Sequence, residues 1–228
     1  MKHFVKPTPN ESIFGLIYFL LQLLVIPVIV LILNMMLGSP ISEVTTNVLL
    51  FALNFVVVLI IFRKFLLKNF QPLVDDPWHV LRFAGIGVLL YMAGNAVFSL
   101  LITSLDPDFA NINDAVIMDM LQDNFGLMTL GTVVLVPVAE ECFYRGLIFR
   151  NIYDRSPLWA YIVSMTLFSL AHVVGYVTLV DFGTLALCFL QYLPAGFALA
   201  FAYRHSGSIF ASILIHMSVN QVGMLMMR

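Results

Sequence analysis

Residues 125–145 read FGLMTLGTVVLVPVAEECFYR, an apolar run that ends in Glu140, Glu141 and, four residues later, Arg145. No charged residue interrupts the run before Glu140. A segment of this kind is typical of a membrane-spanning helix, because a bilayer core of about 30 Å needs roughly 20 apolar residues per helix. The pattern predicts a transmembrane helix with ionisable groups in its inner half.

The composition of the whole chain agrees with a lipid environment. Of its 228 residues, 61% are hydrophobic and 11% are charged, and the mean hydropathy is +0.98. Soluble domains are about 45–50% apolar and about 25% charged. The net charge of −2 excludes a strongly basic surface, so no nucleic acid is expected as a partner. Cys142 and Cys188 stand alone in apolar stretches, which argues against a disulfide framework or a cysteine metal cluster.

Seven segments are apolar enough to cross the bilayer. They cover residues 13–37, 46–62, 83–105, 125–140, 158–180, 182–203 and 209–227. With the N-terminus inside, the inner loops hold all of the 11 Lys and Arg residues except Arg228. The loop at 106–124, which carries Asp residues and no base, then lies outside. This bias supports the orientation and predicts an all-α, polytopic helix bundle in a cell membrane, which we expect to be the bacterial plasma membrane.

The chain is expected to form one integral-membrane domain over residues 1–228. Within it, residues 1–124 would supply three accessory helices and residues 125–228 four catalytic helices. The polar stretches at 62–82 and 106–124 are expected to be loops with some interfacial helix. Two alternatives stay open: residues 111–122 form either a short acidic amphipathic helix or a solvated loop, and a re-entrant segment near residues 175–181 could hide within the fifth span.

Ionisable groups inside a bilayer are costly, so each of them is a candidate functional residue. Glu141 and Arg145 are four residues apart with the acid first, which favours an ion pair on one helix face. Adjacent helical residues point about 100° apart, so Glu140 faces a different neighbour. The pattern predicts one paired and one free carboxylate. The alternative is an interfacial helix end with ordinary charges.

Two later helices carry further polar groups at helical spacing. In the fifth segment, residues 168–172 read FSLAH, and the Phe168 ring lies on the same face as His172. In the seventh, His216 and Asn220 also share a face. Each has a structural alternative, namely a neutral packing histidine or an interhelical hydrogen bond from asparagine. Together they predict a polar cluster on three helices.

Such a cluster is sufficient for amide hydrolysis. A carboxylate can take a proton from water as a general base, and imidazole and carboxamide N–H groups can donate to an oxyanion. One Glu and two His are also a ligand set for catalytic zinc. No HExxH or GxSxG motif is present, and a thiol in apolar surroundings, such as that of Cys142, is a poor nucleophile.

At these residues the chain resembles the CPBP (CAAX protease and bacteriocin-processing) intramembrane proteases, also called the Abi or type II CAAX prenyl endopeptidase family. Residues 140–145 match its EExxxR motif, residues 168–172 its FxxxH motif and residues 216–220 its HxxxN motif. The resemblance covers the segments from the fourth span onward. It implies a helical intramembrane endopeptidase whose site opens toward the cytoplasm.

Carried over by position, the resemblance implies catalytic roles for Glu140, His172, His216 and Asn220 and supporting roles for Glu141, Arg145 and Phe168. Glu140 would activate water with His172, while His216 and Asn220 would stabilise the oxyanion. The sequence leaves zinc open, with Glu140, His172 and His216 as its ligands. We favour glutamate-activated water without a cofactor, because a single free carboxylate cannot easily be both ligand and base.

The substrate is expected to be a membrane-associated peptide or a lipidated protein, with a short leader or pheromone peptide favoured for so small a chain. Two other classes stay open. One is a non-proteolytic membrane factor, such as a bacteriocin self-immunity protein or a scaffold for a sensor kinase. The other is a small transporter with a Glu and His proton relay, which the absence of inverted repeats makes less attractive.

Overall fold

Every regular element in the part of the chain that this computed structural model describes, residues 4–36 and 41–227, is helical. The elements, in chain order, are α1 (Pro9–Leu24), α2 (Ile26–Met36), α3 (Glu43–Ile61), α4 (Arg63–Asp75), α5 (Pro77–Leu105), α6 (Ile112–Thr129), η1 (Leu130–Leu135), α7 (Val136–Glu141), η2 (Cys142–Phe149), α8 (Arg150–Tyr153), α9 (Pro157–Ala171), η3 (Val174–Tyr176), α10 (Phe182–Ser206) and α11 (Ile209–Met226). The prediction of an all-α polytopic bundle is confirmed.

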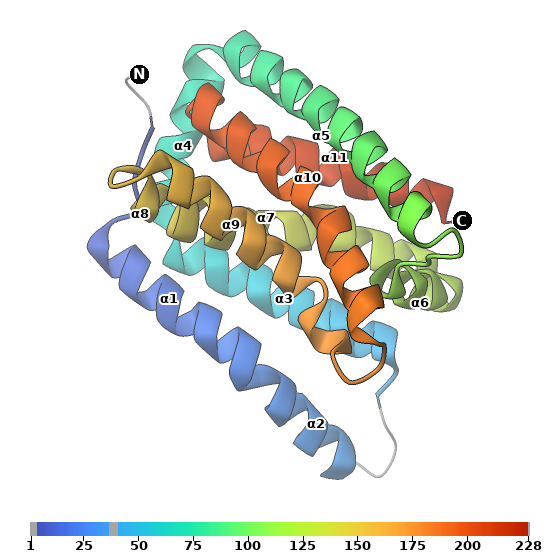
Figure 1. Ribbon diagram of the computed structural model, residues 1–228. Coiled ribbons are helices and arrows are strands. Elements are labelled where there is room, and N and C mark those ends of the chain that lie inside the picture. The colour runs from blue at the N-terminus through green and yellow to red at the C-terminus, as the bar shows by residue number, and fades with distance from the viewer. Residues whose placement is uncertain (1–3, 37–40, 228) are drawn as a thin grey trace.

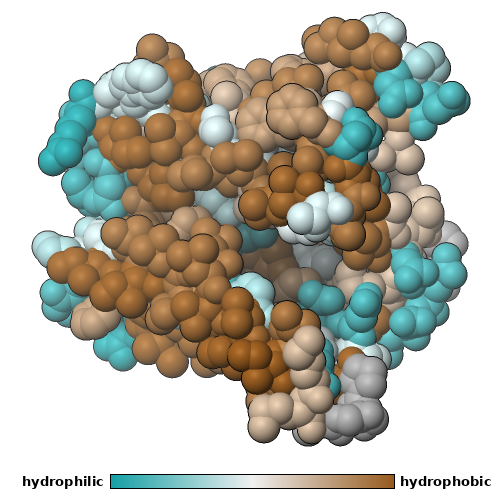
Figure 2. All heavy atoms as spheres, turned by 60° about the horizontal axis from the view of Figure 1, so that its bottom comes forward, coloured by the Kyte–Doolittle hydropathy of each residue, from teal (hydrophilic) through white to brown (hydrophobic). Residues whose placement is uncertain are grey.

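Among the described residues, 6 helices are long and apolar enough to cross a membrane, or 7 if the bent pair α1 and α2 forms one span. Large apolar side chains point outward from them, such as Leu24 on α1 and Leu100 on α5. Figure 2 shows this apolar surface in brown over much of one face. In lipid such side chains need no cover, since the bilayer is their solvent. The chain is a multi-pass membrane protein.

Helix α10 is the centre of the bundle (Figure 1). It packs against α5, α9 and α11, and α11 in turn contacts α5 and α7. Small residues of α10 let these helices approach closely. A Cβ atom added to Gly196 would lie 3.0 Å from the backbone of Met165 on α9, so a larger residue would require the two helices to shift by a few tenths of an ångström. The helices α1 and α2 lie at the edge of the bundle.

The first predicted span is wrong in one respect, because it is not a single helix. The segment expected at 13–37 breaks at Val25 into α1 and α2, which are bent by 43° relative to one another. Pro27, in the first turn of α2, has no N–H to donate and its ring crowds the preceding turn, which is the usual cause of such a bend. Residue 37, the expected end, lies outside the described residues.

The fourth predicted span, 125–140, begins directly after a kink, as the structure has it, but ends too early. The helical path extends from Ile112 to Tyr153, through α6, η1, α7, η2 and α8, with the kink at Asn124. The segment at 111–122, for which the sequence allows helix or loop, is helical, with Asn111 as its N-cap. The path changes direction at Asn124, whose φ of −156° and ψ of 89° are not helical. The polar stretch after residue 62 is likewise mostly helical, as α4 and the start of α5.

The fifth predicted span, 158–180, is too long. Helix α9 ends at Ala171 and the candidate span ends at Tyr176, so His172 is the C-cap residue of α9 and lies near the end of the span, not well inside it. The turn η3 and an irregular segment then lead to Asp181, the N-cap of α10. This short connection occupies the region in which the sequence leaves a re-entrant segment open.

A buried carboxylate ties the N-terminal helix to the following part of the bundle. Glu11 is 5% exposed. Its Oε2 accepts hydrogen bonds from the backbone N–H of Thr8 at 2.8 Å and from the Thr8 hydroxyl at 2.7 Å. Its Oε1 accepts from the backbone N–H of Phe65, in the first turn of α4, at 2.7 Å. One side chain thus caps two helix N-termini, where free N–H groups favour a negative charge.

We predict that Glu11→Ala lowers the free energy of unfolding by about 3 kcal/mol, because hydrogen bonds to a charged acceptor contribute about 1.5–3 kcal/mol each. Thermal unfolding in detergent micelles can be followed by the reaction of the buried thiols of Cys142 and Cys188 with a fluorescent maleimide. The control is Glu43→Ala, which removes an exposed acid from the first turn of α3. Equal unfolding midpoints for the two variants would contradict the prediction.

Candidate functional site

A cavity of about 510 Å³ lies among the helices. Its lining comes from α1, α3, α5, α6, α9, α10 and α11 and from the segment η1–α7–η2. Figure 2 shows that the molecule is hollowed between apolar surfaces, with polar residues at parts of the rim. Cavities of this size accept small ligands or short peptide segments and have room for several waters. Glu140, His172, His216 and Asn220 all line it.

Two π-helical turns, η1 and η2, flank the short helix α7 that carries both glutamates. Pro137 at the start of α7 has no N–H for the helical ladder, and the wider turn before it absorbs the interruption. The two carboxylates diverge as expected. The Glu140 side chain is 23% exposed and lines the cavity, whereas the Glu141 side chain is fully buried.

The predicted ion pair between Glu141 and Arg145 is present. Arg145 Nη1 lies 3.0 Å from Glu141 Oε1, and both side chains are 0% exposed. Arg145 Nη2 donates to the backbone carbonyl of Gly196 on α10 at 3.1 Å, and the guanidinium lies over the Phe168 ring at 4.6 Å. The pair therefore joins α7 and η2, which carry Glu141 and Arg145, to α9 and α10.

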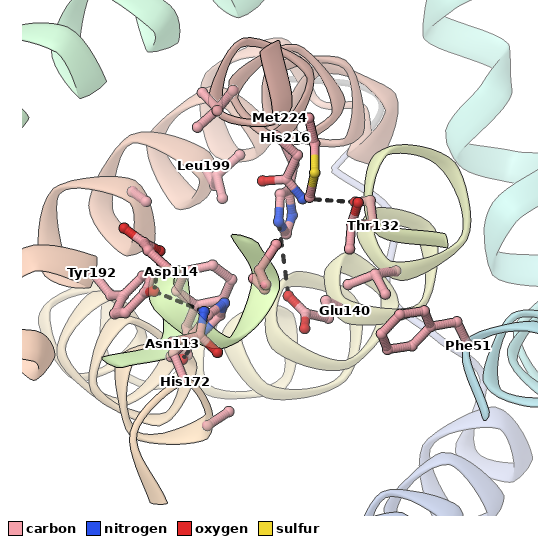
Figure 3. A pocket seen from close by; sticks show the side chains of 18 of the residues that line it. Phe51, Asn113, Asp114, Thr132, Glu140, His172, Tyr192, Leu199, His216 and Met224 are labelled. Carbon is pink, nitrogen blue, oxygen red and sulfur yellow. Dashed lines mark hydrogen bonds and ion pairs between the residues drawn. The ribbon is translucent and has the colours of Figure 1, made fainter. Parts of the chain in front are cut away.

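His216 connects this buried pair to the cavity. Its Nδ1 lies 2.9 Å from Glu141 Oε1, and its Nε2 lies 3.8 Å from Glu140 Oε2. A carboxylate held by arginine only accepts hydrogen bonds, so Nδ1 carries the proton and Nε2 is turned toward Glu140. The distance of 3.8 Å is too long for a direct hydrogen bond, and one water can contact both atoms across it. Figure 3 shows Glu140 and His216 pointing toward one another.

Phe168 packs beside His172, as the sequence predicts, with ring centroids 4.7 Å apart. It also contacts His216, at 5.7 Å. His172 Nδ1 lies 2.8 Å from the Phe168 carbonyl, and its ring stacks on Tyr192 at 4.3 Å. His172 thus reaches the cavity from a different wall, and of the two predicted imidazoles it is His216 that contacts Glu140.

Asn220 lines the cavity one turn beyond His216 on α11. Its Nδ2 donates to the backbone carbonyl of Thr132 in η1 at 2.8 Å. This bond satisfies a carbonyl in a π-helical turn. One N–H of Asn220 therefore makes an interhelical hydrogen bond, which was the structural alternative for this residue. The second N–H of the carboxamide is available to another acceptor.

The residues proposed as zinc ligands do not form a metal site. In the part of the chain that the structure describes, no three His, Cys, Asp or Glu side chains come together in an arrangement that could hold a metal ion. Glu140 and His216 approach one another, but His172 does not join them. The donor set therefore does not fit zinc.

Sequence reasoning missed several polar residues of the cavity wall. Asn54 and Asn95, which fall in the first three predicted spans, line the cavity, and so does Asp114, from the predicted outer loop. Tyr192 and Asn113 lie beside Asp114 (Figure 3). Asp114 could have been noticed as an acid on the apolar-spaced face of α6, since Val116, Ile117 and Met120 on that helix also line the cavity.

The cavity reaches one particular end of the bundle. Asn47, Asn113 and Met227 line it, and they lie where α3 and α6 begin and where α11 ends. The opposite ends of these helices adjoin basic residues, namely Arg63, Lys64, Arg150, Arg155 and Arg204. If the basic end faces the cytoplasm, the lining does not support the expectation of a site open to the cytoplasm.

The buried pair gives the first prediction for the site. Glu141→Gln leaves Arg145 buried without a counter-charge and should lower the free energy of unfolding by about 3–5 kcal/mol. Glu140→Gln should stay close to the wild type, because Glu140 accepts no hydrogen bond from a described protein group. Unfolding curves of the two variants in the same detergent test this contrast. Equal losses would mean that the two carboxylates do not have separate roles.

The three motifs lie within a region that matches a known family. Residues 122–222 match the family model described as type II CAAX prenyl endopeptidase Rce1-like. No curated protein and no solved structure matches the chain. The match contains all the predicted site residues and confirms the resemblance. Over residues 122–222, the chain is similar to the type II CAAX prenyl endopeptidases of the Rce1-like family.

Proposed function

We propose that the protein is an intramembrane endopeptidase in which Glu140 activates a water molecule for attack on a peptide bond. One observation carries the proposal: Glu140 Oε2 and His216 Nε2 face each other across 3.8 Å in a cavity enclosed by membrane-spanning helices. Glu140 Oε2 is buried and accepts no hydrogen bond from a described protein group, so it can accept one from water. The family match independently supports proteolysis.

The reaction follows from this geometry. The water lies between the two atoms, gives one proton to Glu140 and attacks the carbonyl carbon of the scissile bond. The carbonyl oxygen becomes an oxyanion. When the C–N bond breaks, Glu140 returns its proton to the leaving nitrogen, so that a new carboxyl group and a free amine result. Glu140 ends the cycle ionised and ready for another water.

Asn220 is the donor we assign to the oxyanion, whereas His216, with its proton on Nδ1, accepts a hydrogen bond from the attacking water through Nε2. His216 is held by the Glu141–Arg145 pair through its Nδ1, which keeps its Nε2 directed into the cavity. Asn220 has one N–H free of the Thr132 carbonyl. A donor held in advance is effective because it needs no reorganisation during the reaction. His172 stacks on Tyr192 at another wall of the cavity and would face the substrate from that side.

The substrate we propose is a membrane-associated peptide or a lipidated protein, cleaved in a bacterial plasma membrane. The cavity is lined largely by apolar side chains such as Phe51, Met128 and Leu199. An extended apolar segment could lie along them, with its polar backbone directed to the polar groups of the wall. The enclosed position also restricts the site to chains that already reside in or on the bilayer.

We predict that Glu140→Gln abolishes cleavage while the protein stays folded, because the carboxamide cannot take the proton. The measurement uses purified protein in liposomes with two fluorogenic peptides, one farnesylated at a C-terminal cysteine motif and one apolar and unmodified. Wild-type protein should cleave at least one of them, and 1,10-phenanthroline should leave the rate unchanged, since no step uses a metal.

Unfolding curves provide the control, because Glu140→Gln should unfold like the wild type. Full activity of this variant would refute Glu140 as the base. A protein that cleaves nothing, and whose support of immunity or scaffolding is unchanged by Glu140→Gln, would point to the non-proteolytic class instead.

A second experiment locates the cavity end relative to the membrane. Asp108, in the loop before α6, and Arg155, after α8, are both exposed and lie at opposite ends of the bundle. In a variant without Cys142 and Cys188, we expect Asp108→Cys to react with an impermeant maleimide added outside intact bacterial cells and Arg155→Cys to react only in inverted vesicles. The reverse pattern would place the cavity end in the cytoplasm.

A further inference from the structure

A second carboxylate faces the cavity at a distance from the reacting groups. Asp114, in the first turn of α6, is half-buried and lines the cavity. In Figure 3 it lies with Asn113, Tyr192 and His172 on one side, while Glu140 and His216 lie on the other. The proposed hydrolysis makes no use of this carboxylate.

The carboxylate accepts one hydrogen bond, from a neutral group that is itself part of a network. The Tyr192 hydroxyl donates to Asp114 Oδ1 at 3.2 Å. The same hydroxyl accepts from Asn113 Nδ2 at 2.9 Å, and Asn113 Oδ1 accepts from the Tyr176 hydroxyl at 3.0 Å. This network joins α6, α10 and η3 and fixes the direction of the Asp114 side chain.

No permanent cation of the described chain neutralises this group. None of the described Lys and Arg residues lines the cavity, and Asp114 takes part in none of the ion pairs among the described residues. The titratable groups that interact with it are His172, Tyr192, Tyr91, Tyr176 and Cys188. Of these only His172 can become positive, and its Nδ1 is engaged with the Phe168 carbonyl. A carboxylate in such surroundings is costly unless a positive group pairs with it.

We propose that Asp114 determines substrate specificity by binding a positively charged group of the substrate, the side chain of a lysine or arginine or a free α-amino group. This inference rests on the proposed function and names its substrate class: membrane-associated peptides with a cationic residue near the cleaved bond. An ammonium or guanidinium group forms charge-assisted hydrogen bonds to the carboxylate and removes the cost of its burial. The second acid of the cavity, Glu140, favours a positive substrate as well.

A structural role for Asp114 makes a different prediction. An acid in the first turn of a helix interacts favourably with the helix dipole, and α6 also carries the exposed Asp119. If Asp114 only stabilised α6, its substitution would change the unfolding midpoint and leave the choice of substrate unaltered. Asp119→Asn, on the same helix and away from the cavity lining, is the matched control.

The experiment compares two series of otherwise uncharged fluorogenic apolar peptides in liposomes. One series carries a single lysine moved through successive positions, and the other has norleucine in its place. Wild-type protein should prefer lysine at one position by about 10- to 100-fold in kcat/KM, the range for a hydrogen bond between charged groups. Asp114→Asn should lose this preference and still cleave the norleucine peptides, and Asp119→Asn should keep it. Asp114→Lys should prefer glutamate at that position.

Binding to the Glu140→Gln protein separates this inference from the proposed function. The Kd values of the lysine and norleucine peptides are measured by fluorescence anisotropy, with and without the additional substitution Asp114→Asn. A preference for lysine that depends on Asp114 supports the inference even if no peptide is cleaved. Equal Kd values for both series, or a preference that survives Asp114→Asn, would overturn it whether or not the protein is a protease.

Discussion

The buried charges of Arg145 and Glu141 constrain the rest of the site. In the low-dielectric interior of a membrane bundle neither charge can lose its partner without a large cost. The two side chains contact one another at 3.0 Å within one continuous helical segment, but their other hydrogen bonds go to other helices. Arg145 donates to the carbonyl of Gly196, and Glu141 accepts from His216. The pair therefore specifies how α10 and α11 pack against α7 and η2.

This arrangement separates two adjacent glutamates by environment. Glu141 has a structural role, since Arg145 and His216 both donate to its Oε1. Glu140 is turned to the cavity and has no hydrogen bond from a described protein group. The ion pair also fixes the tautomer of His216, because Nδ1 donates to Glu141 and Nε2 is left facing the cavity. Phe168 completes the assembly by packing on the guanidinium and both imidazoles.

The cavity is a product of the whole chain and not of the family region alone. Residues 122–222 match the family model, while Asn54 on α3, Asn95 on α5 and Asp114 on α6 form other parts of the wall. In a bilayer few positions can carry polar groups, so those that line a shared cavity are informative. The region that the family model matches holds the residues to which we assign catalysis. The segments before it supply the other parts of the cavity wall.

Much of the fold was predictable because its determinants are local. Apolar runs of the length of a bilayer specify spanning helices, and the spacing of Glu141 and Arg145 predicts their ion pair on a single helix. The break at Pro27, the early end of α9 and the long path from Ile112 to Tyr153 were missed, since helix ends depend on contacts beyond the local pattern.

By itself the sequence determined the helical class, the membrane location and the three polar motifs, because hydropathy and helical periodicity need only neighbouring residues. Only the tertiary structure decided that His216, not His172, contacts Glu140, and that Asp114 shares the cavity with them. These relations join residues far apart in the chain. They depend on how helices tilt, bend and pack, which is set by side-chain contacts between helices and not by the spacing within any one of them.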